Sequence, residues 1–168
     1  RRKSYKVKRI NLTQKQLALV DDEDYEWLNQ WKWHAIFSDD SNTYYAKRTD
    51  RTNGKQRSIL MHREIVKTPI ELFTDHKDHN GLNNQKYNLR VCVRQKNNWN
   101  KRIQSNNTSG YKGVSWNKPM KKWQAYIRKD YRKLSLGYFD SLEDAAKEYD
   151  KKAIEYFGEF AETNVGKR

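Results

Sequence analysis

Apolar and polar residues alternate along residues 122–129, with Trp123, Ala125 and Ile127 on one side of the segment. A period of two residues is typical of a half-buried β-strand. Residues 134–136 repeat the alternation. The pattern therefore predicts strands of a small antiparallel sheet with one apolar face.

A helix is predicted directly after these strands. Ser141 is a typical N-cap residue, with Asp144 three positions later, and apolar residues then recur at helical spacing up to Phe157. Gly158 ends the run, as glycine often does after a helix. We expect the C-terminal segment to form a three-stranded antiparallel sheet packed on one helix.

The first hundred residues alternate less regularly. The pattern predicts strands near residues 6–12, 16–20, 33–37, 43–48 and 58–61, and short helices at 22–30 and 62–67. It then predicts a strand ending at Asp75 and His76, a polar loop, a strand at 89–93 and a helix at 94–102.

A polar stretch, KRIQSNNTSG at residues 101–110, lacks apolar periodicity and is expected to link two domains. We expect the domains to be residues 1–104 and 105–168. With strands and helices in both, the predicted fold class is α+β.

The composition favours folded modules that bind a polyanion. Only 35% of the 168 residues are hydrophobic, but 13% are aromatic, more than disordered chains usually contain. The sequence has 35 Lys and Arg against 21 Asp and Glu, a formal charge of +14. The opening segment RRKSYKVKR has six basic residues in nine, and is either an arm on DNA or a solvated terminus.

The distribution of charge indicates which element faces the polyanion. Residues 110–137 contain eight basic residues and one acidic residue, whereas residues 140–164 contain three basic and eight acidic residues. We therefore expect the sheet, and not the helix, to bind the polyanion.

The sequence also indicates a cellular location and excludes some sites. It has no apolar run long enough to span a membrane, and its start lacks the apolar block of a secretion signal, so we expect a cytoplasmic protein that is not secreted. Cys92 is the only cysteine, which excludes a disulfide within the chain and a four-cysteine zinc site.

Candidate chemistry lies in the predicted hairpin. Asp75 supplies a carboxylate, His76 is a residue type suited to act as a base near neutral pH, and Asn97 supplies a carbonyl oxygen. Few oxygen ligands, completed by waters and a phosphate, are typical of Mg²⁺ sites. The chemistry indicated is attack of water on a phosphodiester, with no small-molecule cofactor.

Three motifs carry a family resemblance: the DH pair at 75–76, the NLR run at 88–90 and the QxNxxN tail at 95–100. Residues 75–100 closely resemble the HNH nuclease family. The segments ALVDDEDYEWL (18–28) and MHREI (61–65) are similar to the N-terminal portion of phage and intron-borne members. The resemblance implies a nuclease domain of the ββα-metal type, with a core near residues 72–102 and, by analogy, a homing or nicking function.

The resemblance also implies roles for four residues. His76 would be the general base, Asp75 and Asn97 would ligate a single divalent ion (Mg²⁺ or another such as Mn²⁺), and Asn88 would orient the imidazole of His76. Cleavage would leave 5′-phosphate and 3′-hydroxyl ends. His79 receives no role: it is either a phosphate contact or an exposed loop residue.

Residues 108–164 contain the runs YKGVSW, KWQAYI, LGYF and EDAAKEYD. They resemble the DNA-binding domain of plant ethylene-response factors, which implies that the sheet lies in the major groove of double-stranded DNA. The implied contact residues are Lys112, Ser115, Tyr126, Arg128, Lys133 and Ser135. The plant domains have arginine and tryptophan where this chain has Ser115 and Ser135, and an acid at Tyr126, so their target sequence is not carried over.

Other interpretations stay open from the sequence. His76, His79 and Cys92 could join in a zinc site, but no fourth ligand is evident nearby, so no structural zinc is expected. The hairpin could be a decayed site, which would make the protein a non-catalytic DNA-binding regulator. RNA binding is the least supported hypothesis, because the sequence has no stacking-aromatic motif of the usual RNA-binding modules. One site per chain favours a monomer that nicks DNA, although a dimer could cut both strands.

Two histidines outside the motifs, His34 and His62, are interpreted as packed or capping residues. Five tryptophans are interpreted as core residues: Trp27, Trp31, Trp33, Trp116 and Trp123.

Overall fold

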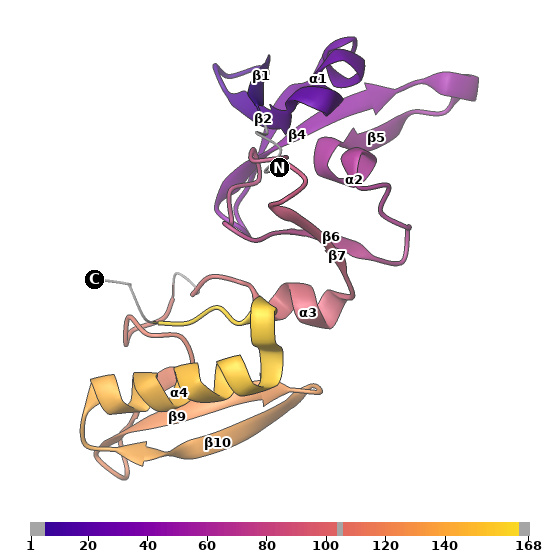
Figure 1. Cartoon of the computed structure of the whole chain (residues 1–168). Helices are drawn as coiled ribbons and strands as arrows, with labels where there is room; N and C mark the ends of the chain where they lie inside the picture. Colours follow the sequence, from indigo (N-terminus) through magenta and orange to yellow (C-terminus); the bar gives the residue numbers. More distant parts are fainter. Residues whose placement is uncertain (1–5, 104–105, 165–168) are drawn as a thin grey trace, which may run out of the picture. The chain divides into compact units, whose positions relative to one another are not determined.

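The computed structural model describes residues 6–103 and 106–164 (Figure 1). Residues 1–5 of the predicted basic arm and residues 104–105 of the predicted linker lie outside the described residues. The chain divides into two compact units, Arg1–Arg94 and Gln95–Arg168, and each is described by itself. The boundary predicted from the linker sequence falls inside the second unit.

The first unit consists of three small antiparallel sheets with short helices between them. The β1–β2 pair, the sheet with strand order β3-β4-β5 and the β6–β7 hairpin follow one another along the chain. Its elements are β1 (Val7–Asn11), β2 (Leu17–Asp21), α1 (Asp22–Asn29), β3 (His34–Ser38), β4 (Thr43–Asp50), the 3₁₀ turn η1 (Thr52–Gly54), β5 (Arg57–Leu60), α2 (Met61–Ile65), β6 (Phe73–His76) and β7 (Leu89–Cys92). The strands and helices predicted up to residue 67 are confirmed to within two residues.

The core of the first unit lies between the β1–β2 pair, α1 and α2. Ile10, Val20, Leu28 and Met61 are buried together there with Trp33, whose indole N–H donates to the Leu28 carbonyl oxygen at 2.9 Å. This bond satisfies the one polar atom of a buried ring that fills much of the core.

The second unit is a three-stranded sheet covered by one long helix, as the sequence predicts (Figure 1). Its elements are α3 (Arg94–Trp99), which begins in the first unit, β8 (Val114–Asn117), β9 (Lys122–Lys129), β10 (Arg132–Phe139), α4 (Leu142–Phe157) and η2 (Gly158–Phe160). The strand order is β10-β9-β8, and α4 packs its apolar face on Val114 and Ala125. The helix predicted at 94–102 is shorter, because α3 ends at Trp99.

Both ends of α4 are as the sequence predicts. The Ser141 hydroxyl accepts a hydrogen bond from the Asp144 backbone N–H at 3.2 Å, which caps the first turn. Gly158 follows the helix with φ +53°, a conformation that glycine adopts without a Cβ penalty.

Two tryptophans predicted to be core residues are at the surface, so these two predictions are wrong. Trp31 is 45% exposed because it follows the end of α1 and packs against Arg48 at the rim of the unit. Trp116 is 46% exposed on edge strand β8, where it packs edge-on against Trp123 across the strand pair. No helix among the described residues is long and apolar enough to cross a membrane.

Candidate functional site

The β6–β7 hairpin places Asp75 opposite Arg90 and His76 opposite Leu89. Asp75 and His76 are only 7% and 6% exposed. The Arg90 Nε donates to Asp75 Oδ2 at 2.6 Å. Because a buried carboxylate is costly without a partner, this ion pair compensates the charge of Asp75 and fixes the orientation of its side chain.

The imidazole of His76 is held by a hydrogen bond and by two neighbouring rings. Its Nε2 lies 3.3 Å from Asn84 Oδ1. An amide oxygen can only accept, so Nε2 carries the proton in this contact and Nδ1 is the unprotonated nitrogen of the neutral ring. The rings of His62 and Tyr45 lie 5.0 Å and 5.7 Å from the His76 ring, measured between centroids.

Burial lowers the pKa of His76 from its ordinary value. The hydrogen bond with Asn84 and the carboxylates of Asp78 and Asp75 oppose the shift in pKa without cancelling it. His76 is therefore neutral at pH 7, which is the form that a general base requires.

His62, at the start of α2, has the larger shift in pKa of the two histidines. Burial, followed by repulsion from His76 once it is protonated and from Arg63, lowers the pKa of His62 to about 3. Its Nδ1 is buried and has no hydrogen-bond partner among the described residues. His62 is thus a neutral imidazole packed edge-to-face against His76, at an interplanar angle of 78°.

The loop that follows His76 is organised around the carboxylate of Asp78. Asp78 Oδ1 accepts from the Asn80 backbone N–H at 2.8 Å and from Asn88 Nδ2 at 2.9 Å, and Asp78 Oδ2 accepts from Asn83 Nδ2 at 2.7 Å. The Asn88 Oδ1 in turn accepts from the Asp78 N–H at 3.0 Å. Asn88 Nδ2 also donates to the Asn83 carbonyl oxygen at 2.8 Å. The Asn88 side chain therefore forms hydrogen bonds with both the start and the middle of the loop.

The same loop is attached to β2 and β4. Leu19 of β2 donates to the Leu82 carbonyl and accepts from the Asn84 N–H, both at 2.8 Å. Gly81 lies so close to β4 that a Cβ there would come within 2.4 Å of the Tyr44 carbonyl oxygen. The loop therefore requires glycine at this point, and it presents Asn84 to His76 from a fixed position.

The structure adds several residues to this site that the sequence does not single out. Asn84, Asp78, Tyr45 and His62 surround His76 in the structure, and none of them was assigned a role in catalysis. The run of asparagines at 80–88 was the available signal, since a loop whose amides are buried must use them in hydrogen bonds. The ring contacts had no signal in local spacing, because Tyr45 and His62 come from distant elements.

The predicted role of Asn88, orientation of the His76 imidazole, stays a prediction. Its hydrogen bonds described above fix the loop, and its own carbonyl oxygen accepts from the Lys77 N–H at 2.9 Å. Asn97 lies on α3 in the second unit, so its proximity to Asp75, and with it the closing of a ββα-metal core, also stays a prediction.

In the second unit, five of the six predicted DNA-binding residues share one face of the sheet. Tyr126 pairs with Ser135, Arg128 pairs with Lys133, and Ser115 lies across from Gln124 on the same face. This face is opposite to Ala125 and Ile127, which are buried beneath α4. The Lys133 ammonium lies 3.9 Å from the Tyr126 ring centroid, and Arg128 and Lys133 are exposed.

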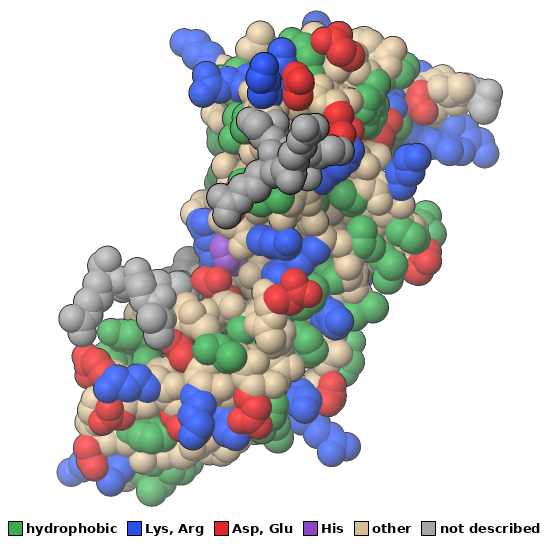
Figure 2. All heavy atoms as spheres, viewed as in Figure 1, with side chains coloured by type: hydrophobic (Ala, Val, Ile, Leu, Met, Phe, Trp, Pro, Cys, Tyr) green, Lys and Arg blue, Asp and Glu red, His purple; other side chains and the backbone are tan. Residues whose placement is uncertain are grey.

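Lys112, the sixth predicted DNA-binding residue, precedes β8 instead of lying on the open face. Its ammonium donates to the carbonyl oxygens of Trp99 and Lys101 at 2.8 and 2.6 Å. It thereby attaches the segment after α3 to the sheet, and its contact with DNA stays a prediction. On the α4 side of the unit, acidic and basic side chains lie among one another (Figure 2).

Comparison with known proteins gives two relatives. Protein 3.8 of Escherichia phage T7 is 34% identical over 93 residues, which are 55% of this chain and 76% of that protein. The chain belongs to the family of phage T7 protein 3.8. A mimivirus protein named as the uncharacterized HNH endonuclease L560, from Acanthamoeba polyphaga mimivirus, is 37% identical over 98 residues, 58% of this chain and half of that protein.

The match to the mimivirus protein supports an HNH-type nuclease. Both of these relatives are phage or viral proteins. No family model matches the chain. The likeness of residues 108–164 to the plant DNA-binding domains stays a prediction.

The donor chemistry at Asp75 fits a hard divalent cation. The described residues contain no group of three or more His, Cys, Asp or Glu side chains that could hold a metal. Mg²⁺ does not need such a group, since it is commonly bound through one or two carboxylates together with waters and substrate phosphates. A buried carboxylate of fixed orientation beside a neutral imidazole is compatible with this mode of binding.

Proposed function

We propose that this protein is a metal-dependent DNA endonuclease of the HNH type. The observation that carries the proposal is the buried Asp75–His76 pair at the end of β6, on a chain similar to a protein named as an HNH endonuclease. In this proposal Asp75 and Asn97 hold one Mg²⁺ or Mn²⁺ ion, and His76 is the general base.

The contacts of His76 support its role in proton transfer. Asn84 occupies Nε2, so the proton of the attacking water goes to Nδ1. The neighbouring rings and the fixed loop restrict rotation of the imidazole, which keeps Nδ1 in one direction. Asn88 supports this geometry by holding the loop that carries Asn84. When bound, the ion supplies charge stabilisation at the scissile phosphate and the departing 3′ oxygen.

The experiment that tests the proposal is a plasmid cleavage assay. Supercoiled plasmid is incubated with the full chain and Mg²⁺, with and without a chelator, and the same assay is run on His76→Ala. Nicked or linear plasmid that depends on Mg²⁺ and on His76 supports the nuclease. His79→Asn is the matched control: it removes another histidine of the same loop, and asparagine tolerates the positive φ of 61° found there.

The alternative is a non-catalytic DNA-binding regulator, and the same assay decides against the nuclease if plasmid stays intact with Mg²⁺ and with Mn²⁺. If the protein acts as a monomer with one site per chain, nicked circles should accumulate before linear product. Linear product from the first time point, together with a dimer in solution, would contradict the monomer.

For DNA binding, we propose that the open face of the β8–β9–β10 sheet contacts the major groove. Its exposed cations Arg128 and Lys133 face away from α4, as expected for phosphate or base contacts. Removing one cation that binds a phosphate should reduce the slope of log affinity against log salt concentration by about one. Arg128→Gln and Lys133→Gln should each show this reduction, and Lys147→Gln, an exposed lysine on α4, is the control.

A further inference from the structure

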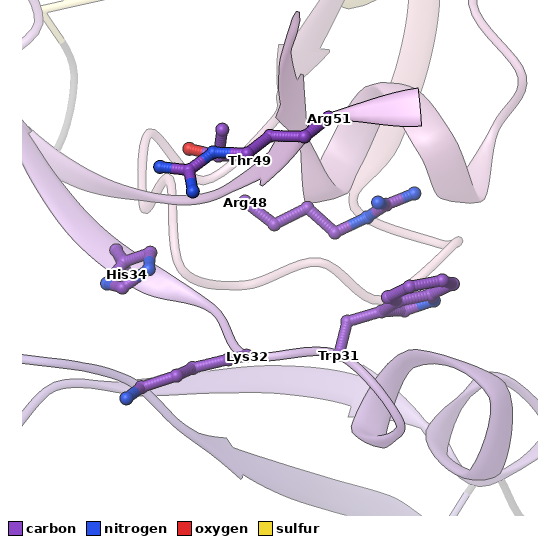
Figure 3. Close-up of a pocket in the computed structure, with 6 residues that line it drawn as sticks. All are labelled: Trp31, Lys32, His34, Arg48, Thr49 and Arg51. Carbon is purple, nitrogen blue, oxygen red and sulfur yellow. The ribbon is translucent and has the colours of Figure 1, made fainter. Parts of the chain in front are cut away.

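The described part of the first unit has a surface hollow of about 380 Å³ between the segment that precedes β3 and the end of β4 (Figure 3). Its lining contains no Asp or Glu. The lining residues are Trp31, Lys32, His34, Arg48, Thr49 and Arg51.

Arg48 forms a fixed wall of this hollow, and its charge is already compensated. Its Nε and terminal nitrogen donate to the two carboxylate oxygens of Glu64 at 3.2 and 2.6 Å. The guanidinium also lies 4.4 Å from the Trp31 ring centroid. The paired Arg48 therefore shapes the hollow and contributes little net charge to it.

The remaining basic side chains are uncompensated. The side chains of Lys32, His34 and Arg51 form no hydrogen bond or ion pair within the described residues. In Figure 3 their nitrogen-bearing ends point to one side of the hollow, and Trp31 and Arg48 point to the other. Two unpaired cations and an imidazole around one hollow produce a positive potential that attracts an anionic group.

Strand β4 connects the hollow to the His76 site. Alternate side chains of a strand share a face, so Tyr45, Lys47 and Thr49 lie on one face of β4. Tyr45 packs against the ring of His76, Lys47 pairs across the sheet with His34, and Thr49 lines the hollow. At about 3.4 Å per residue, Thr49 lies about 14 Å along the strand from Tyr45.

We propose that this hollow binds the sugar-phosphate backbone of the DNA substrate, on the flank of the bond that is cut. The link to that bond rests on the proposed nuclease function, because β4 lines the hollow with Thr49 and packs Tyr45 against His76. Lys32 and Arg51 bind phosphate oxygens, and Trp31 packs against the adjoining sugar. The first unit thereby contacts DNA on its own, apart from the sheet of the second unit.

The test measures binding of the full chain to duplex DNA over a range of salt concentrations, in chelator, so that no cleavage occurs. The double variant Lys32→Gln/Arg51→Gln should lower the slope of log affinity against log salt by about two. The control is Lys8→Gln/Lys67→Gln, which removes two exposed lysines of the same unit that do not line the hollow. Lys8 already lies 3.5 Å from Asp22, so the control should change the slope little.

An unchanged slope in the Lys32→Gln/Arg51→Gln variant, or an equal change in the control, would overturn the proposal. So would a response of Lys32 and Arg51 resonances to inorganic phosphate with no change in the DNA slope, because the hollow would then be a small-anion site. A lowered slope in a protein that leaves plasmid intact would refute the nuclease and retain the DNA contact.

Discussion

His62 makes a quantitative prediction about acid stability. The folded protein holds this imidazole neutral, with a pKa of about 3, against an ordinary value of 6.5 in an unfolded chain. Between these two values the unfolded state binds a proton at His62 and the folded state does not. Stability rises with pH wherever the unfolded state binds more protons, so it must fall as the pH drops from 6.5 towards 3.

The magnitude follows from the shift. Each pH unit below 6.5 costs about 1.4 kcal/mol in the free energy of unfolding until the folded-state pKa is reached. At pH 4.5 the loss from His62 is about 2 to 3 kcal/mol relative to pH 7. Since His62 is only 6% exposed, solvent screening reduces this figure little.

The assay compares wild type with His62→Gln, a polar side chain that does not titrate, in urea unfolding at pH 7 and pH 4.5. Because the chain has two units, the reporter must belong to the first. The indole N–H of Trp33, buried and bonded to Leu28, gives an NMR signal that reports this unit. The loss of stability between the two pH values should be smaller in His62→Gln by about 2 to 3 kcal/mol.

Acid-sensitive groups remote from His62 contribute equally to both proteins and cancel in this comparison, whereas His76, which contacts His62, does not. Equal losses of stability in wild type and His62→Gln would refute the reasoning, because they would mean that His62 is protonated in the folded state or is not buried in solution. At pH 7 the variant should not be greatly destabilised, since Nδ1 of His62 has no partner to lose among the described residues.

Three further predictions concern the loop, the base and the second unit. Gly81→Ala should destabilise the first unit by about 3 kcal/mol in the same urea assay, because the new Cβ would clash with the Tyr44 carbonyl; an unchanged midpoint would contradict the close approach. The pH at which the cleavage rate is halved should lie below 6.5, since burial lowers the pKa of His76; a rate that is halved at or above pH 6.5 would contradict this. Asn164→Ala should lower the free energy of unfolding of the second unit by about 3 kcal/mol, because the buried Asn164 side chain forms hydrogen bonds with Asp150 and with the main chain of Lys112, before β8. Urea unfolding followed by the amide NMR signals of the second unit measures this loss. A loss below about 1 kcal/mol would contradict the role of these hydrogen bonds.

The second unit could be predicted well from its sequence because its signals are local. The two-residue period at 122–129, the cap at Ser141 and the glycine at 158 each act within a few residues, and the structure has β9 and α4 at these positions. The wrong assignments of Trp31 and Trp116 have the opposite origin. Whether a tryptophan is buried depends on what covers it, and local spacing contains no information about an element end or a sheet edge.

At the candidate site, too, local sequence spacing does not show which residues pack around His76. Asp75 and His76 could be singled out because a carboxylate and an imidazole stand side by side in the sequence. The residues that give His76 its neutral form and its orientation come from β4, α2 and the loop, 31, 14 and 8 positions away. Burial by Tyr45 and His62 is a consequence of tertiary packing, and it is burial that lowers the pKa of His76.

The loop after His76 holds its shape through its own hydrogen bonds, without a bound ion. A carboxylate surrounded by amide donors, as Asp78 is, needs no metal or cation to be stable, so the loop can hold its shape before any ion arrives. Arg90 does the same for Asp75. The protein thus fixes the orientation of its carboxylate and of its base through separate hydrogen bonds. Removing the ion should therefore abolish cleavage and leave the His76 ring and the Asp78 loop in place, which the NMR signals of His76 with and without chelator would show.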